Sequence, residues 1–293
     1  MYKHKKTITH YALRITNYNE RVDTLQSHKI HLTPPYSKAN LSGADLTPTL
    51  TCLIHDSDPE RRFPAVIAVP GGSYEHCSKR EGEPCAARWY SHGYNSFVLD
   101  YSCVDKPFPT ALLELAAAVE YIRANAEALR CTDKIIITGF SAGGHLTASL
   151  AVHHSRYQHL FTENIRPDLT VLCYPVITAG RYTHALSAKN IAPTDDLKAL
   201  ANLENHVAET TPPSFIWHCA DDKTVPVQNS LMYATALSEK EIPYELHIFP
   251  QGGHGIAMCD ITTIRNGDPR YVNPTAAQWF PLALDWTERM LQI

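Results

Sequence analysis

Short apolar runs alternate with segments of helical periodicity from about residue 27 of this 293-residue chain to its end. Most of the later runs, such as KIIIT and LTVLC, are apolar on successive residues, which is typical of strands covered on both faces. Between them, the segment TALLELAAAVEYIRANAEAL has the spacing of an amphipathic helix. The sequence therefore predicts an α/β fold, with a mostly parallel, doubly wound sheet of about eight strands flanked by helices. A pair of antiparallel strands is expected to lead into it.

The domain organisation follows from the same alternation. Residues 27–293 are expected to form a single domain, and residues 1–26 an N-terminal arm. Two stretches near residues 177–213 and 256–275 are expected to be small cap or loop insertions. In doubly wound sheets, functional residues gather at the carboxyl ends of the strands. The segments that directly follow the strands are therefore the places to look for chemistry.

Charge and composition exclude several classes of function. The chain has 26 basic and 30 acidic residues, a formal charge of −4, so we expect neither a nucleic acid nor a membrane partner. Its first twenty residues contain no continuous apolar stretch of the kind found in a secretion signal, and no apolar run reaches the roughly eighteen residues that span a bilayer. Its 8 cysteines form no C-x-x-C pair and its 16 histidines no H-E-x-x-H motif. We expect a cytoplasmic protein with free thiols and neither metal nor cofactor.

A nucleophile is indicated where one strand runs directly into a helix. The run KIIIT leads into GFSAGG, residues 139–144, and a helical segment follows. A serine held on such a turn needs small neighbours, because its backbone is strained and the flanking chains pass close together. The glycines and Ala142 supply them, so Ser141 is the predicted nucleophile. His145, four residues after Ser141, is expected to lie at the start of the helix or to pack in the interior.

An oxyanion hole is expected at the end of an earlier strand. The run PAVIAV ends in PGGSY, residues 70–74, which takes the place of the H-G-G-G motif of lipases and esterases. Backbone N–H groups at such a site stabilise the alkoxide that forms when a serine attacks a carbonyl. The N–H of Ala142, just after the nucleophile, is expected to supply the other donor.

A general base and its carboxylate follow in the order that α/β-hydrolases use, serine, then acid, then histidine. SFIWHCADDKTVP places Asp221 and Asp222 just after a strand, and YELHIFPQGGHG places His254 in a glycine-flanked loop after the next one. Successive side chains diverge, so only one aspartate can orient His254. We expect the other to cap a turn or the following helix.

Together these residues resemble the α/β-hydrolase fold, and more narrowly the bacterial acetyl-esterase and acetylxylan-esterase-like group of carboxylesterases and lipases. The resemblance covers about residue 60 to the C-terminus and rests on PGGSY, GFSAGGHL, DDKTVPVQNS and ELHIFPQGGHG. It implies that the acid is Asp222, the first residue of D-x-x-V-P, with Asp221 as the runner-up. It also implies that the oxyanion N–H groups are those of Gly72, Ser73 and Ala142.

The predicted function is hydrolysis of an ester through an acyl-enzyme on Ser141. The resemblance implies short-chain, often acetyl, esters, so the expected partner is a small ester such as an acetylated sugar. Bulky side chains at Tyr74, Phe140 and Tyr174 are expected around the carbonyl and would favour short acyl groups, unless they belong to the core, with Phe140 beneath the serine turn. The oligomeric state is not predicted.

Two alternative functions are considered. A peptidase or amidase of the prolyl-oligopeptidase type shares the serine turn and the order of acid and histidine, but such enzymes carry a large propeller or cap. The roughly sixty residues before the first core strand are too few for one. A non-catalytic α/β-hydrolase acting as a binding module commonly lacks a member of the triad, and none is missing from this sequence.

Overall fold

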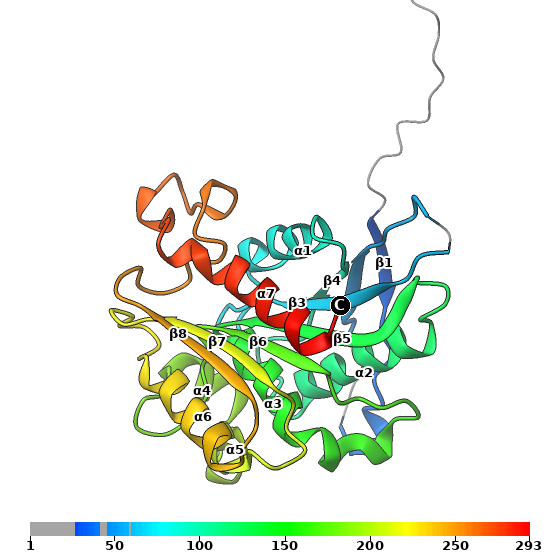
Figure 1. The fold of residues 1–293 in the computed structure, drawn as a ribbon. Coiled ribbons are helices and arrows are strands. Elements are labelled where there is room, and N and C mark those ends of the chain that lie inside the picture. Colours follow the sequence, from blue (N-terminus) through cyan, green and yellow to red (C-terminus); the bar gives the residue numbers. More distant parts are fainter. Residues whose placement is uncertain (1–26, 42–45, 59) are drawn as a thin grey trace, which may run out of the picture.

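The computed structural model describes residues 27–41, 46–58 and 60–293 (Figure 1). The N-terminal arm predicted at residues 1–26 lies outside the described residues. In the ranges that are described, no helix is both long and apolar enough to cross a membrane.

The fold is built on a sheet of eight strands in the order β1-β2-β4-β3-β5-β6-β7-β8. The antiparallel pairs are β1 with β2 and β2 with β4, and all the other neighbours are parallel. This confirms the predicted fold class. The strands are β1 (Ser27–His31), β2 (Thr49–Leu53), β3 (Phe63–Val69), β4 (Asn95–Asp100), β5 (Cys131–Phe140), β6 (Leu169–Cys173), β7 (Ser214–Cys219) and β8 (Tyr244–Phe249).

Helices cover both faces of the sheet, with α1 and α7 on one face and α2, α3 and α6 on the other (Figure 1). Strand β3 shows why the central runs are apolar throughout. Its residues Ala65, Ile67 and Val69 pack into the core beneath α2 and α3, whereas Val66 and Ala68 pack beneath α1 and α7. The helices are α1 (Glu83–Tyr90), α2 (Thr110–Ala124), α3 (Ala142–Tyr157), α4 (Ala185–Ile191), α5 (Asp195–Ala201), α6 (Gln228–Glu239) and α7 (Trp279–Leu291).

The two stretches expected as insertions contain short elements. Residues 177–213 hold α4, α5 and the 3-10 turn Leu203–His206, and residues 256–275 hold the 3-10 turns Ile261–Thr263 and Pro269–Tyr271. That these stretches act as a cap on a single domain stays a prediction.

The parallel pairing decides where the functional segments meet. Strands β3, β5, β6, β7 and β8 run in the same direction, so their carboxyl ends lie at one edge of the sheet. The PGGSY segment, Ser141, the two adjacent aspartates and His254 follow β3, β5, β7 and β8 in turn. The sheet therefore brings to one edge residues that lie up to 184 positions apart, from Pro70 to His254.

Candidate active site

Ser141 occupies the tight turn between β5 and α3. Its backbone has φ 52° and ψ −116°, a combination that is rare for any residue with a side chain. The backbone N–H of Ser141 donates to the Cys173 carbonyl on the neighbouring strand at 3.0 Å, which fixes the turn to the sheet. Ser141 is largely buried, with 7% of its surface exposed to solvent. The strained turn thus presents the Ser141 hydroxyl at the edge of the sheet.

Two glycines permit the close packing that this turn requires. A Cβ atom on Gly143 would lie 2.1 Å from the Val69 carbonyl oxygen, and one on Gly139 would lie 2.2 Å from Oγ1 of Thr147. Neither position has room for a side chain. The start of α3 therefore packs directly against the backbone at the end of β3, which is where the oxyanion hole was predicted.

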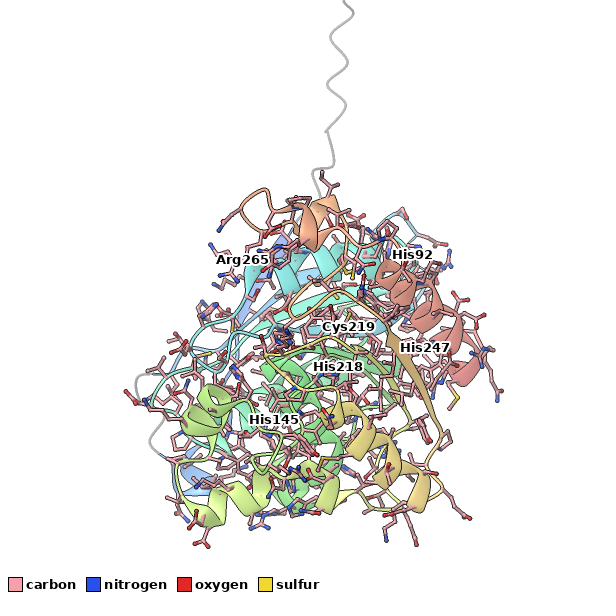
Figure 2. The ribbon with its side chains drawn as sticks, turned by 90° about the vertical axis from the view of Figure 1, so that its left-hand side faces the viewer. His92, His145, His218, Cys219, His247 and Arg265 are labelled. Carbon is pink, nitrogen blue, oxygen red and sulfur yellow. The ribbon has the colours of Figure 1, made fainter. Side chains whose placement is uncertain are left out.

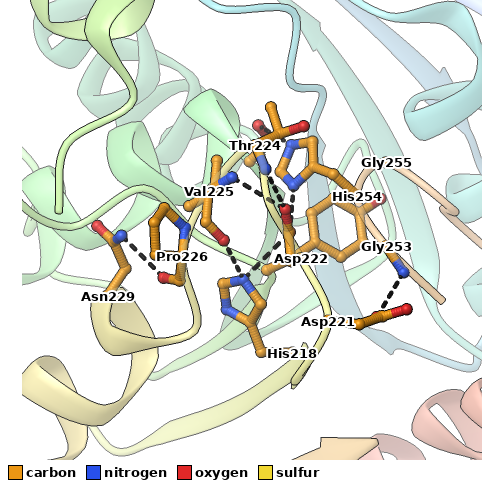
Figure 3. Close-up of polar contacts among 12 residues, drawn as sticks. His218, Asp221, Asp222, Thr224, Val225, Pro226, Asn229, Gly253, His254 and Gly255 are labelled. Atoms are coloured by element: carbon orange, nitrogen blue, oxygen red, sulfur yellow. Dashed lines mark hydrogen bonds and ion pairs between the residues drawn. The ribbon is translucent and has the colours of Figure 1, made fainter. Parts of the chain in front are cut away.

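A continuous hydrogen-bonded chain links Ser141, His254 and Asp222. Ser141 Oγ lies 2.8 Å from His254 Nε2, and His254 Nδ1 lies 2.6 Å from Asp222 Oδ2. The other carboxylate oxygen of Asp222 accepts the backbone N–H groups of Thr224 and Val225, each at 2.9 Å (Figure 3). The structure thus brings together the three residues predicted for a serine-histidine-acid triad.

The surroundings of Asp222 keep its carboxyl group charged. Burial alone would raise the pKa of this group. Hydrogen bonds from His218, from His254 and from the Val225 N–H outweigh that effect and hold the pKa of Asp222 well below its usual range. An ionised carboxylate therefore faces the Nδ1 side of His254, which favours the tautomer with the proton on Nδ1 and leaves Nε2 free to accept a proton.

Asp221 points elsewhere and supports the histidine loop. Its Oδ1 accepts the backbone N–H of Gly253 at 2.8 Å (Figure 3). The two aspartates diverge as expected, and Asp221 holds a turn, the one at Gly253, and not the following helix. The following helix, α6, begins after Val227 without a side-chain cap.

The segment after β3 supplies unpaired backbone donors beside Ser141. Gly72 and Ser73 both have positive φ, 125° and 60°, which turns this segment back on itself. A Cβ on Gly71 would lie 2.9 Å from the Ser141 Cβ, so the segment passes close to the nucleophile. No described residue accepts a hydrogen bond from the N–H of Gly72, Ser73 or Ala142. These three N–H groups are available to a ligand atom.

A pocket of about 740 Å³ lies over this arrangement. It is lined by Ser141 and His254 and by both predicted oxyanion residues after β3. Charged and aromatic side chains complete its wall, namely Lys79, Arg80, Glu81, Arg265 and Tyr271. In the described parts of the chain, no group of three or more histidine, cysteine, aspartate or glutamate side chains is arranged to hold a metal ion.

Comparison with known proteins assigns the chain to a family. A sequence model of the prolyl oligopeptidase family matches residues 112–264, which is more than half of the 293 residues. The chain belongs to this family of α/β-hydrolases. The family is named after a peptidase, but the relatives described below have the names of esterases and carbohydrate hydrolases.

Two solved structures are similar to this prolyl oligopeptidase family member over nearly their whole length. The acetyl ester-xyloside bifunctional hydrolase from Caldicellulosiruptor lactoaceticus is 32% identical with a TM-score of 0.77, covering 88% of this chain and 96% of that one. The carboxylesterase Cest-2923 from Lactobacillus plantarum WCFS1 is 29% identical with a TM-score of 0.78, covering 90% and 97%. The fold and the family resemblance predicted from the sequence are thus confirmed.

Two curated relatives are longer proteins. Endo-1,4-beta-xylanase B of Butyrivibrio fibrisolvens is 40% identical over 225 residues, which cover 73% of this chain and 35% of the relative. Acetylxylan esterase of Xylanibacter ruminicola is 29% identical over 221 residues, which cover 71% and 44%. The chain therefore spans about a third of the first relative and less than half of the second.

His218 is a residue of this family member that the sequence reasoning missed. It is fully buried on β7, four residues before Asp222, and its Nε2 lies 2.9 Å from the Val225 carbonyl and 3.3 Å from Asp222 Oδ2. Its Nδ1 lies 2.7 Å from the Ser230 hydroxyl on α6. His218 thus contacts the same carboxylate oxygen of Asp222 that faces His254, and helps to fix it in place (Figure 3). A histidine inside an apolar strand close to the predicted acid was the available signal, because a buried imidazole needs partners.

Glu81 belongs to a segment, residues 80–84, that also carries the family resemblance, but the sequence reasoning assigned it no role. It is 3% exposed, and its Oε2 accepts the Gly71 N–H at 3.1 Å while its Oε1 accepts the Tyr174 hydroxyl proton at 2.8 Å. The Tyr174 ring packs edge-on to the His254 ring with centroids 5.0 Å apart. One buried carboxylate therefore supports both the oxyanion segment and the aromatic side chain that packs on the histidine.

The three aromatic residues predicted to contact substrate are buried, and none of them lines the pocket over Ser141. Tyr74, Phe140 and Tyr174 are 3%, 0% and 0% exposed. Phe140 faces the core under α1 and α7, and the Tyr74 hydroxyl binds Nδ1 of His145 at 2.8 Å. The prediction that these side chains surround the ester carbonyl is therefore corrected, since their hydroxyls and rings serve the core and the segments behind the site. His145 packs in the interior, as expected.

Proposed function

We propose that this chain is a serine carboxylesterase that hydrolyses short-chain, acetyl-type esters, including those of carbohydrates. The observation that carries the proposal is the unbroken chain from Ser141 Oγ through His254 to Asp222, with distances of 2.8 Å and 2.6 Å. An imidazole placed in this way can remove the serine proton and later return it. No metal or organic cofactor is needed for that chemistry.

The proposed reaction has two halves. His254 Nε2 takes the proton of Ser141 as Oγ attacks the ester carbonyl, and the carbonyl oxygen becomes an oxyanion beside the N–H groups of Gly72, Ser73 and Ala142. His254 then gives the proton to the departing alcohol, leaving an acyl-enzyme on Ser141. Water, deprotonated by the same imidazole, attacks the acyl group and restores the serine. Asp222 stabilises the imidazolium at both stages.

The names of similar proteins favour ester bonds over peptide bonds. The relatives with the most specific names are an acetylxylan esterase, a carboxylesterase and a bifunctional acetyl ester-xyloside hydrolase. A panel of p-nitrophenyl esters, acetylated sugars and peptide p-nitroanilides, assayed with the purified protein, tests this directly. If the protein releases p-nitroaniline from the peptides but no acetate from the esters, the proposed function is wrong and the protein is a peptidase.

Acyl-chain preference is a prediction that the pocket itself supports. Burying a methylene in apolar surroundings gains about 0.8 kcal/mol, but the wall of this pocket carries the charged groups of Lys79, Arg80 and Arg265, which a long alkyl chain would desolvate. We expect kcat/KM to be greatest for p-nitrophenyl acetate and to be lower by about tenfold or more for the octanoate. A single methylene that fits a pocket poorly can lower kcat/KM by about that factor. The four substrates to compare are acetate, butyrate, octanoate and palmitate. A maximum at octanoate or beyond would identify a lipase instead.

The pH profile is a second prediction. Only a neutral imidazole accepts the serine proton, so a reaction that uses a histidine base should show kcat/KM rising from pH 5 to 8. Asp222 does not contribute to this rise in kcat/KM, because its lowered pKa keeps its carboxyl group ionised from pH 5 to 8. Burial lowers the pKa of His145 and of His153 to about 4, so these histidines do not contribute either. A profile that is flat from pH 5 to 8 would contradict a histidine base.

The proposal places the enzyme in the cytoplasm. All eight cysteines are free, and six of them are buried. Unpaired thiols in this number are typical of a reducing compartment. The net charge of −4 supports a small-molecule substrate in preference to a nucleic acid.

A further inference from the structure

Positive charge gathers around the pocket over Ser141. Lys79, Arg80 and Arg265 all line it, the first two from the turn before α1 and the third from the 256–275 loop. Among the residues that line it, Glu81 is the only carboxylate, and both of its oxygens already accept hydrogen bonds. The chain as a whole has a formal charge of −4. The pocket is thus a locally positive region of an acidic molecule.

None of these three cations has a carboxylate partner among the residues that the structure describes. Near the pocket, Arg88 pairs with Asp260, and Arg270 pairs with Asp268. By contrast, neither Lys79 nor Arg265 forms an ion pair with any residue that the structure describes. Both side chains are exposed, and Arg265 is labelled in Figure 2. Their charges are therefore free to meet a charged ligand.

Arg80 adds a positive charge that is fixed in place. Its guanidinium donates to the Thr263 carbonyl at 2.9 Å and to the Gly255 carbonyl at 3.0 Å, and it lies over the Tyr271 ring at 4.9 Å from the centroid. These partners are neutral, so none of them cancels the charge. Gly255 directly follows the histidine of the triad, so this charge lies beside the reacting groups.

We propose that Lys79 and Arg265, with Arg80 behind them, form a subsite for an anionic substituent on the alcohol part of the ester. The proposal rests on the proposed function, in which the acyl part is an acetyl group and carries no charge. A guanidinium binds carboxylate and phosphate alike through paired N–H donors. The substrate class is therefore an acetylated sugar that carries a carboxylate or a phosphate.

The experiment compares acetylated sugars that differ in the group carried at C6, and the uronate and the uronamide form the pair that differs essentially in charge. Acetate release is measured from an acetylated methyl uronoside, from its neutral uronamide and from the matching sugar 6-phosphate. Charge-assisted hydrogen bonds of this kind are expected to favour an anionic member over the uronamide by about tenfold or more in kcat/KM at low salt. Salt screens exposed charges, so the preference should shrink at high ionic strength. Whether the uronate or the phosphate is preferred identifies the source of the anion.

Variants connect the preference to the named residues. The double variant Lys79→Gln with Arg265→Gln should remove most of the preference for the anionic sugars, leaving only the contribution of Arg80. Arg270→Gln is the matched control, because Arg270 is exposed in the same loop but its charge is already paired with Asp268. Hydrolysis of the uronamide with no preference for either anion would overturn the subsite and leave the proposed esterase standing. Failure to hydrolyse any ester, the neutral one included, would overturn the proposed function itself.

Discussion

Replacing Ser141 with alanine should lower kcat for p-nitrophenyl acetate by about 10⁶, the loss found when a serine hydrolase is deprived of its nucleophile. The reason is the 2.8 Å contact between Ser141 Oγ and His254 Nε2, which has no substitute once the hydroxyl is removed. The measurement is steady-state hydrolysis, together with labelling by a fluorophosphonate probe. The probe should modify the wild-type protein at Ser141 and leave the variant unlabelled.

A matched control separates loss of the nucleophile from loss of the fold. Ser155 lies on the same helix, α3, and is exposed, so Ser155→Ala makes the same chemical change away from the pocket. We expect that variant to keep its activity and its labelling. If Ser141→Ala retains activity within tenfold of the wild type, or if the probe modifies another residue, Ser141 is not the nucleophile.

Replacing Asp222 with asparagine should lower kcat by about 10⁴, because an amide facing Nδ1 favours the wrong imidazole tautomer. The structure gives a close control in the neighbouring residue. Asp221→Asn keeps a side-chain oxygen for the Gly253 N–H and does not touch His254, so its effect should be far smaller. Both variants are compared by kcat at saturating ester. A greater loss for Asp221→Asn than for Asp222→Asn would reverse the assignment of the acid.

The features that could be predicted from the sequence are those that a short local pattern at the end of a strand specifies. Ser141 and His254 each stand in a short segment whose composition identifies the turn that holds it, and the order of the strands brings the segments together. The local pattern left Asp221 and Asp222 open, and only the family resemblance favoured Asp222. The fold could be predicted for the same reason, since continuous apolar runs separated by amphipathic helices admit few arrangements.

The supporting residues could not be predicted in this way. Glu81 acts through Tyr174, which is 93 positions away, and nothing in the residues next to either one indicates the contact. The direction of Phe140 depends on which face of β5 it occupies at the point where the strand turns into the serine loop. That direction comes from the packing of α7, where Trp279 meets the Phe140 ring with centroids 6.1 Å apart. Long-range packing of this kind leaves no local signal in one sequence.

The bare backbone contact between α3 and β3 has a consequence for how this protein can change over evolution. At Gly143 the helix meets the Val69 and Pro70 carbonyls with no side chain between them, so any substitution there would push the serine away from the oxyanion segment. The reacting groups are thus held by main chain that tolerates little variation. The loops at 177–213 and 256–275 have no such constraint along most of their length. New substrates are therefore expected to be acquired by rewriting these loops, while the parts that break the bond stay as they are.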